Sequence, residues 1–75
     1  MARITKLQKI TKERNTVHDA ADAAYTIFTG LDGKRYLQID TYGSERRKIK
    51  GETSQCLQFD ESCALELKRI IEDEL

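Results

Sequence analysis

The segment from Glu61 to Leu75 has a helical pattern of apolar positions. Its apolar side chains recur at intervals of three and four residues, which is the spacing of one face of a helix. These positions are Ala64, Leu67, Ile71 and Leu75, widened by Cys63 and Ile70. Asp60 is a good N-cap, and the acidic Glu61 suits the positive end of the helix dipole. The pattern predicts one helix over residues 61–75.

The middle of the chain alternates apolar and polar side chains, which is typical of strands. Residues 24–29 and 36–42 are rich in β-branched and aromatic side chains, and a third alternating run covers residues 54–59. An Asp32–Gly33 pair lies between the first two runs, and such a pair between strands is a strong hairpin signal. We therefore expect three strands, the first two joined by a tight turn.

A two-residue turn at Asp32–Gly33 implies a particular pairing. It sets Phe28 opposite Leu37 and Thr26 opposite Ile39, because register follows from turn length. Phe28, Leu37 and Ile39 then form a core face together with Leu57 and Phe59 of the third run. The opposite, wetter face receives Tyr25, Tyr36, Gln38 and Tyr42.

The N-terminal part of the chain supplies the remaining strand. Ile4, Leu7 and Ile10 are spaced by three, and we interpret residues 4–12 as a strand and residues 13–23 as a connecting loop. The expected fold is α+β: a single domain of residues 1–75 with a four-stranded antiparallel sheet followed by one C-terminal helix, in the order ββββα.

The formal net charge is zero, but the charges are unevenly distributed. Residues 1–50 have a balance of +5 and residues 51–75 a balance of −5. Three consecutive acids, Glu72, Asp73 and Glu74, oppose the negative end of the helix dipole, so we expect them to meet basic groups of the chain's own N-terminal half or of a partner subunit. No apolar run is long enough for a membrane span or a signal peptide, so a cytoplasmic protein with no membrane contact is expected.

The small size of the chain limits its function. A domain of 75 residues buries little surface, so we expect self-association, as a homodimer, and no enzymatic cavity. Cys56 and Cys63 are expected to be reduced thiols, with Cys63 in the core. His18 with Asp19 and Asp22 is a poor zinc site. We expect no catalytic residue, metal or cofactor.

The polar face of the predicted sheet is the candidate binding site. Tyrosines and glutamines lie there, and the basic run from Arg46 to Lys50 follows Tyr42. Aromatic side chains that stack bases beside a basic groove bind single-stranded nucleic acid. The alternative is that these residues have no binding role: the tyrosines are there as good strand formers, and the basic run is a solvated loop. The candidate nucleic-acid-binding residues are Tyr25, Lys34, Arg35, Tyr36, Gln38, Tyr42, Arg46, Arg47, Lys48 and Lys50.

Short motifs in residues 24–71 resemble the PC4-like family of transcriptional coactivators. The matching elements are the string Tyr36–Tyr42, the basic run Arg46–Lys48 with Gly51, Leu57, and the Leu67-Lys68-x-Ile70 motif. The resemblance implies a dimer of curved four-stranded sheets with the helices involved in dimerisation. It also implies that single-stranded DNA is bound by the sheet face and the basic loop. The loop departs from the family form, since it lacks a proline and a first glycine and has Ile49 and Lys50 inserted. The strings of residues 36–44 and 54–60 are also similar to a group of short bacterial proteins, a resemblance that implies no activity.

Two function classes follow. The first is a small module that binds single-stranded DNA or RNA in transcription or DNA maintenance. The second is a protein-interaction module without nucleic-acid binding, such as an inhibitor or adaptor from a mobile element. Its basis is the short chain, the zero net charge and the acidic helix end, since tyrosine and arginine are also common anchors of protein interfaces.

Overall fold

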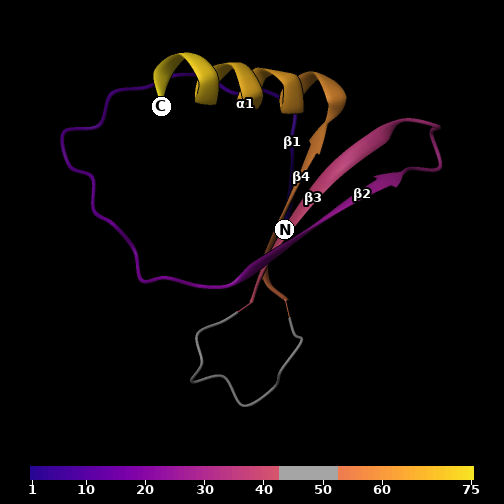
Figure 1. The fold of residues 1–75 in the computed structure, drawn as a ribbon, viewed down its shortest axis with the longest axis horizontal. Coiled ribbons are helices and arrows are strands. Elements are labelled where there is room, and N and C mark those ends of the chain that lie inside the picture. Colours follow the sequence, from indigo (N-terminus) through magenta and orange to yellow (C-terminus); the bar gives the residue numbers. More distant parts are fainter. Residues whose placement is uncertain (43–52) are drawn as a thin grey trace.

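The computed structural model describes residues 1–42 and 53–75 of the chain. Four strands and one helix follow each other along these residues (Figure 1). They are β1 (Ala2–Ile4), β2 (Ala23–Thr29), β3 (Arg35–Tyr42), β4 (Thr53–Asp60) and α1 (Glu61–Glu74). The last four elements agree with the predicted ranges to within one residue at each end. The predicted strand over residues 4–12 is wrong, because β1 ends at Ile4.

The strands form one mixed sheet in the order β1-β4-β3-β2. The strand β3 is antiparallel to both of its neighbours, whereas β1 pairs with β4 in parallel, with Ile4 beside Phe59. The predicted α+β class and ββββα order are confirmed, but the fully antiparallel arrangement is wrong at β1. The strands β1 and β2 follow each other in the sequence but lie at opposite edges of the sheet, so the connection between them must be long. Residues 5–22 form this connection (Figure 1).

The hairpin between β2 and β3 differs from the prediction by one residue. Phe28 pairs with Tyr36, not with Leu37. The Gly30 N–H donates to the Lys34 carbonyl at 2.7 Å and the Gly33 N–H to the Gly30 carbonyl at 3.0 Å. The loop therefore has three central residues, and only Gly33 has a positive φ, of 79°. A two-residue type I′ turn would need a positive φ at Asp32 as well, which the three-residue loop avoids.

The shift of one residue exchanges the faces of β2. Phe28 joins Tyr36 and Gln38 on the face away from α1, so the prediction of Phe28 in the core is wrong. Tyr25 pairs with Ile39 and moves to the face on which α1 packs. The faces of β3 and β4 are as expected, since Leu37 pairs with Phe59 beneath the helix.

The helix α1 packs against β3 and β4. It begins directly after β4, and the Asp60 carboxylate accepts a hydrogen bond of 2.8 Å from the Cys63 N–H, which confirms the predicted N-cap. Cys63 and Phe59 are both 6% exposed and form the centre of the core, whereas Ile71 and Leu75 of the predicted stripe are exposed. Within the described residues, no helix combines the length and apolar character needed to cross a membrane.

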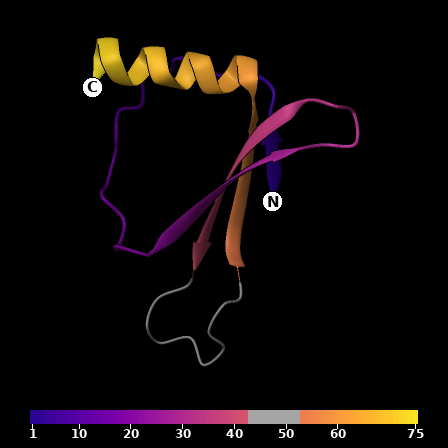
Figure 2. The same ribbon diagram turned by 45° about the vertical axis from the view of Figure 1, so that its right-hand side comes forward.

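The acidic end of α1 contacts the N-terminal segment. Lys9 Nζ lies 2.7 Å from Glu74 Oε1, and both Leu7 and Ile10 line a groove with Ile70 of the helix. Figure 2 shows this segment passing along the C-terminal half of α1. Lys9 of the basic half therefore meets Glu74, as the charge pattern predicts. The other two acids of the run, Glu72 and Asp73, pair instead with Lys68 and Arg69 of α1 itself.

Candidate nucleic-acid interface

The face of the sheet opposite α1, called the open face from here on, has a line of hydrogen-bonded polar side chains. Gln58 Nε2 donates to Gln38 Oε1 at 2.8 Å, and Gln38 Nε2 donates to Asp40 Oδ2 at 3.0 Å. The amide of Gln38 and, to a lesser extent, the thiol of Cys56 hold the pKa of Asp40 below its ordinary value. Asp40 is therefore a carboxylate at neutral pH, in the middle of the open face.

An aromatic pair lies at the end of the open face nearest the β2–β3 turn. The rings of Phe28 and Tyr36 are stacked, with centroids 5.5 Å apart and an interplanar angle of 25°. The Tyr36 hydroxyl donates to Asp32 Oδ2, and Asp32 Oδ1 accepts from the Lys34 N–H at 2.9 Å. A Cβ at Gly30 would lie 2.9 Å from the Tyr36 ring, so glycine permits this close approach.

The contacts around Asp32 shift two pKa values in opposite directions. The hydrogen bond from Tyr36 is the largest cause that lowers the pKa of Asp32, followed by the Lys34 backbone N–H. The same hydrogen bond raises the pKa of Tyr36, with burial as the second cause. Tyr36 is only 8% exposed. Its ring therefore supports the turn and Phe28, and has little surface left for a ligand.

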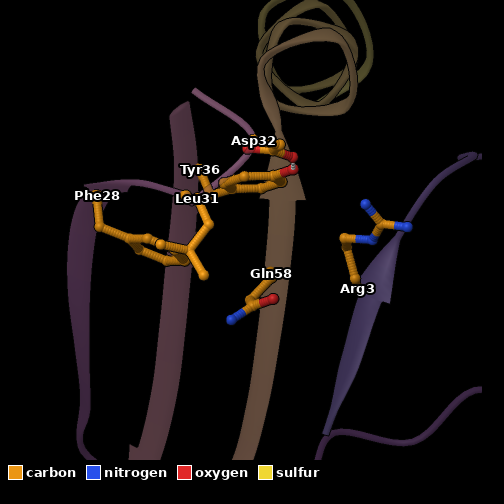
Figure 3. Close-up of a pocket in the computed structure, with 7 residues that line it drawn as sticks. Arg3, Phe28, Leu31, Asp32, Tyr36 and Gln58 are labelled. Carbon is orange, nitrogen blue, oxygen red and sulfur yellow. Dashed lines mark hydrogen bonds between the residues drawn. The ribbon is translucent and has the colours of Figure 1, made fainter. Parts of the chain in front are cut away.

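An open hollow of about 410 Å³ lies beside the aromatic pair (Figure 3). Four elements of the chain contribute side chains to it: β1, β2, the turn with β3, and β4. The lining residues are Arg3, Phe28, Gly30, Leu31, Asp32, Tyr36 and Gln58. Arg3 pairs with Gln58 across the β1–β4 ladder, so its guanidinium lies on the open face. The hollow thus combines an aromatic surface, an amide, the positive charge of Arg3 and the negative charge of the Asp32 carboxylate.

The structure brings together only part of the predicted binding set. Tyr36 and Gln38 share the open face. Tyr42 is the last residue of β3, and its N–H donates to the Asp22 carbonyl at 2.9 Å. Tyr25 lies on the helix side, so its predicted position on the tyrosine face is wrong.

The basic residues of the predicted set are distributed differently. Lys34 belongs to the β2–β3 turn. Arg35 pairs with Thr29 and shares the helix-side face with Leu37. The four residues Arg46, Arg47, Lys48 and Lys50 lie outside the described residues.

Sequence reasoning missed Phe28 and Arg3 as members of this site. Phe28 was assigned to the core because a two-residue turn was assumed. The available signal for the longer loop is Gly33, since a type I turn closed by a left-handed glycine is the usual three-residue hairpin loop. Arg3 lies before the predicted first strand, and only the parallel β1–β4 pairing brings it to the open face.

Neither cysteine has the exposure or the lowered pKa of a reactive thiol. Cys56 and Cys63 are free and buried. The hydrogen bond to Asp40 raises the pKa of Cys56, and burial is the main cause that raises the pKa of Cys63. Over residues 1–42 and 53–75, no group of three or more His, Cys, Asp or Glu side chains is arranged to hold a metal ion.

Comparison with known proteins adds no relative. No protein-family model matches the chain, and neither a curated protein nor a solved structure matches it. The structure defines a small α+β domain with a mixed four-stranded sheet and one C-terminal helix. Its function is therefore argued from the chemistry of its own surfaces.

Proposed function

We propose that this protein binds single-stranded nucleic acid on the open face of its sheet, with one base stacked on Phe28 in the hollow beside Arg3. The single observation that carries the proposal is the Phe28–Tyr36 pair at 5.5 Å, which lies within the same hollow as an arginine and a glutamine. Aromatic surfaces that stack bases and basic groups that meet phosphates are the two components of single-strand binding sites.

The different exposure of Phe28 and Tyr36 gives the two rings different roles in the proposed site. Tyr36 is 8% exposed and its hydroxyl is bonded to Asp32. Phe28 is half-buried and belongs to an edge strand, so part of its ring faces the hollow. Phe28 is therefore the residue that stacks on the base in this proposal, and Tyr36 packs against the Phe28 ring and fixes its position.

The charges on the open face favour one path for the strand. Asp40 is negative and lies in the middle of the sheet, while Arg3 lies on the short edge strand β1. Phosphates are attracted to Arg3 and repelled by Asp40 and by the Asp32 carboxylate at the turn end of the hollow. The phosphate backbone would follow the β1 edge, and the base edges would meet the amides of Gln38 and Gln58, which can donate and accept hydrogen bonds.

A titration with a labelled oligo-dT at low salt, read by fluorescence anisotropy, tests the proposal. Wild-type protein should bind, and Phe28→Ala should weaken binding by about 5- to 150-fold, the loss expected for one base stack of ~1–3 kcal/mol. Arg3→Ala should also reduce the salt dependence by about one released counterion. An oligonucleotide of mixed sequence and an RNA of the same length report base and sugar preference.

Two controls make the titration decisive. Leu65→Ala changes an exposed apolar residue of α1, on the other side of the molecule, and should leave binding unchanged. Far-UV circular dichroism of each variant checks that the sheet is intact. No binding by wild-type protein at micromolar concentration contradicts the proposal, and so does equal weakening by Leu65→Ala.

The remaining expectations from the sequence belong to the same proposal. The basic run Arg46–Lys50 follows β3 in the sequence and would add charge for phosphates. The resemblance to PC4-like coactivators suggests DNA as the ligand and a role in transcription or DNA maintenance, in the cytoplasm. Replacing Arg46 and Arg47 by Ala together should lower both the affinity and the salt dependence in the same titration.

A protein-interaction module is the second candidate function, and one observation favours it. Tyr25, Ile27 and Leu57 share the helix-side face and are 75%, 49% and 40% exposed, although apolar side chains on such a face are usually covered. A pull-down from nuclease-treated lysate separates the two candidates. A stable protein partner that survives the nuclease favours the interaction module, whereas loss of all partners favours nucleic acid.

A further inference from the structure

The outer edge of β2 has backbone groups available for another strand. In the β2–β3 ladder, Gly30 donates to Lys34, and Asp22 accepts from Tyr42. The peptide groups of the even-numbered residues of β2 therefore point toward β3. Because successive residues alternate, the N–H and C=O groups of the odd-numbered ones point to the free edge. These residues are Ala23, Tyr25, Ile27 and Thr29.

The two edges of the sheet differ in how they are protected. The edge strand β1 has three residues, one of which is Arg3, and shortness and charge both discourage further pairing. The edge strand β2 has seven residues, Ala-Ala-Tyr-Thr-Ile-Phe-Thr, without a charge or a proline. In both views of the described chain, no other segment runs along the outer side of β2 (Figures 1 and 2). An edge of this kind is a template for another strand.

The side chains on this edge are apolar and uncovered. Tyr25 is 75% exposed and Ile27 is 49% exposed, and both lie on the helix-side face. The principal contacts of α1 with the sheet are to β3 and β4, so the β2 side of that face is left bare. No side chain in the described part of the chain is less than 2% exposed. Over residues 1–42 and 53–75 the core is therefore not fully closed, and additional burial would stabilise it.

We propose that β2 pairs antiparallel with β2 of a second copy of this chain, which joins two sheets into one of eight strands. A two-fold axis at Thr26 aligns all seven residues of both strands. In this register Tyr25 forms a hydrogen-bonded pair with Ile27 of the partner subunit, and Ala23 does so with Thr29 of the partner subunit. Aromatic and β-branched side chains are favourable cross-strand neighbours. The proposal is independent of nucleic-acid binding.

The charges flanking β2 favour a second copy as the occupant. Asp19 and Asp22 precede the strand, whereas Lys34 and Arg35 lie at its other end, on the far side of the turn. Antiparallel pairing brings the acidic end of one strand next to the basic end of the other, and two-fold symmetry repeats this match. The nearby Asp32 keeps its negative charge, so the turn end of the strand, with Lys34 and Arg35, has a net positive charge opposite the acidic end of the partner strand. A strand of the same sequence therefore fits this edge in hydrogen bonding, apolar contact and charge.

The first test measures the oligomeric state by sedimentation equilibrium. Wild-type protein should form a dimer with a measurable dissociation constant. Tyr25→Lys should raise that constant by about tenfold or more, because each contact is lost twice and a lysine on an edge disfavours pairing. The matched control is Leu31→Lys, which adds the same charge at a fully exposed turn position and should not weaken the dimer, because this end of the strand faces the acidic end of the partner strand.

The second test determines the register by disulfide trapping. In the proposed pairing, Thr26 faces Thr26 of the partner subunit in a non-hydrogen-bonded pair, with Cα atoms about 4.5 Å apart, a distance that a disulfide can span. Thr26→Cys should therefore form a covalent dimer under mild oxidation. Thr29→Cys should not, because it lies away from the axis, and the buried native thiols of Cys56 and Cys63 should not react in wild-type protein.

These measurements support or overturn the proposal. A dimer that Tyr25→Lys dissociates and Thr26→Cys traps supports it. A protein that stays monomeric at every concentration overturns the proposal, and the outer edge of β2 would then be a binding site for a different protein. A dimer that Leu31→Lys weakens as much as Tyr25→Lys, or that Thr29→Cys traps as well as Thr26→Cys, overturns the interface and its register. Oligo-dT binding by a monomeric protein would leave the proposed function standing while this inference fails.

Discussion

On the helix-side face of one sheet, β4 is covered and β2 is bare. Phe59 of β4 is 6% exposed, whereas Tyr25 of β2 is 75% exposed, although both side chains point to the same side of the sheet. Hydrophobicity and alternation therefore do not decide which of these residues is buried. The reach of α1 decides it.

The position of the helix explains this difference. The helix α1 begins at Glu61, directly after β4, so its first turns lie over Phe59. Its later turns extend away from the sheet and pack on the segment containing Leu7 and Ile10 (Figure 2). Fourteen residues make a helix about 21 Å long. Four of them, Glu66, Arg69, Ile70 and Glu74, line the groove with the N-terminal segment. The β2 side of the face receives no cover from α1.

The largest difference in the free energy of unfolding should appear between two truncations on the helix-side face, one under α1 on β4 and one on the uncovered β2. Phe59→Ala should destabilise the domain by about 3 kcal/mol or more, because it opens a cavity under α1. A domain of this size has roughly 4–11 kcal/mol of stability, so the variant should keep about 1–8 kcal/mol and unfold at a clearly lower urea concentration. Tyr25→Ala should cost less than about 0.5 kcal/mol in the monomer. Urea unfolding at the lowest practical protein concentration measures both, and equal losses would contradict the comparison.

A smaller effect is expected at the residue that starts the helix over β4. Asp60→Ala removes the acceptor for the Cys63 N–H and should lower stability by about 1 kcal/mol. Asp60→Asn keeps a good cap and is the matched control, with most of the stability retained. Thermal unfolding followed by circular dichroism compares the three proteins. If Asp60→Asn lost as much as Asp60→Ala, the charge rather than the cap would position α1.

Much of the fold could be predicted from the sequence because its signals are local. The alternation of residues 36–42 and 54–59, and the helical period with its Asp60 cap, depend on neighbours within a few residues. The position of β1 could not be predicted, because its parallel partner β4 is about fifty residues away. Three-residue spacing of Ile4, Leu7 and Ile10 does not distinguish a strand from a segment packed on a helix.

The candidate site was predicted less well, since one turn decides its composition. The Asp32–Gly33 pair suits turns of two or three residues, and the choice between them exchanges Phe28 and Tyr25 between faces. The structure adopts the longer turn, in which only Gly33 needs a positive φ. Thus Tyr36 and Gln38 were predicted on the correct face, while Phe28 could be assigned only from the observed register.

The open face provides a third prediction, because Tyr36 is buried there without a helix above it. Its cover is the Phe28 ring and the turn, joined by the hydrogen bond to Asp32. That bond holds the pKa of Asp32 below its ordinary value of 3.8, so the stabilisation is present above 3.8 and is lost as the pH falls through the lowered value. The bond also raises the pKa of Tyr36, so stability is lost again as the pH rises through that raised value.

Tyr36→Phe isolates this contribution. The variant should be less stable than wild type at neutral pH, and the difference should shrink when the Asp32 carboxylate is protonated below pH 3.8. Urea midpoints of both proteins at neutral and acidic pH measure the change. Asp32→Asn serves as the control and should remove the acid-dependent part without removing the ring stack. A difference between wild type and Tyr36→Phe that does not change with pH would contradict this account.

The smallest effect should come from the far end of α1, where the helix leaves the sheet. Lys9 and Glu74 form an ion pair at 2.7 Å, and their side chains are 81% and 36% exposed. The hydrogen bond raises the pKa of Lys9 and lowers that of Glu74, but solvent screens such an exposed pair. Lys9→Ala should therefore leave global stability nearly unchanged and increase fraying of the last turn.

Amide hydrogen exchange at Leu75 gives a local measure of this fraying, because its N–H donates to the Ile71 carbonyl at 3.3 Å. Exchange there should be faster in Lys9→Ala at low salt, and the difference should decrease at high salt. Lys6→Ala is the matched control, since Lys6 makes no ion pair within the described residues. If both variants behaved alike, the apolar contacts of Leu7 and Ile10 would hold the end of α1 without help from the Lys9–Glu74 pair, while Glu72 and Asp73 keep their partners Lys68 and Arg69 on the helix.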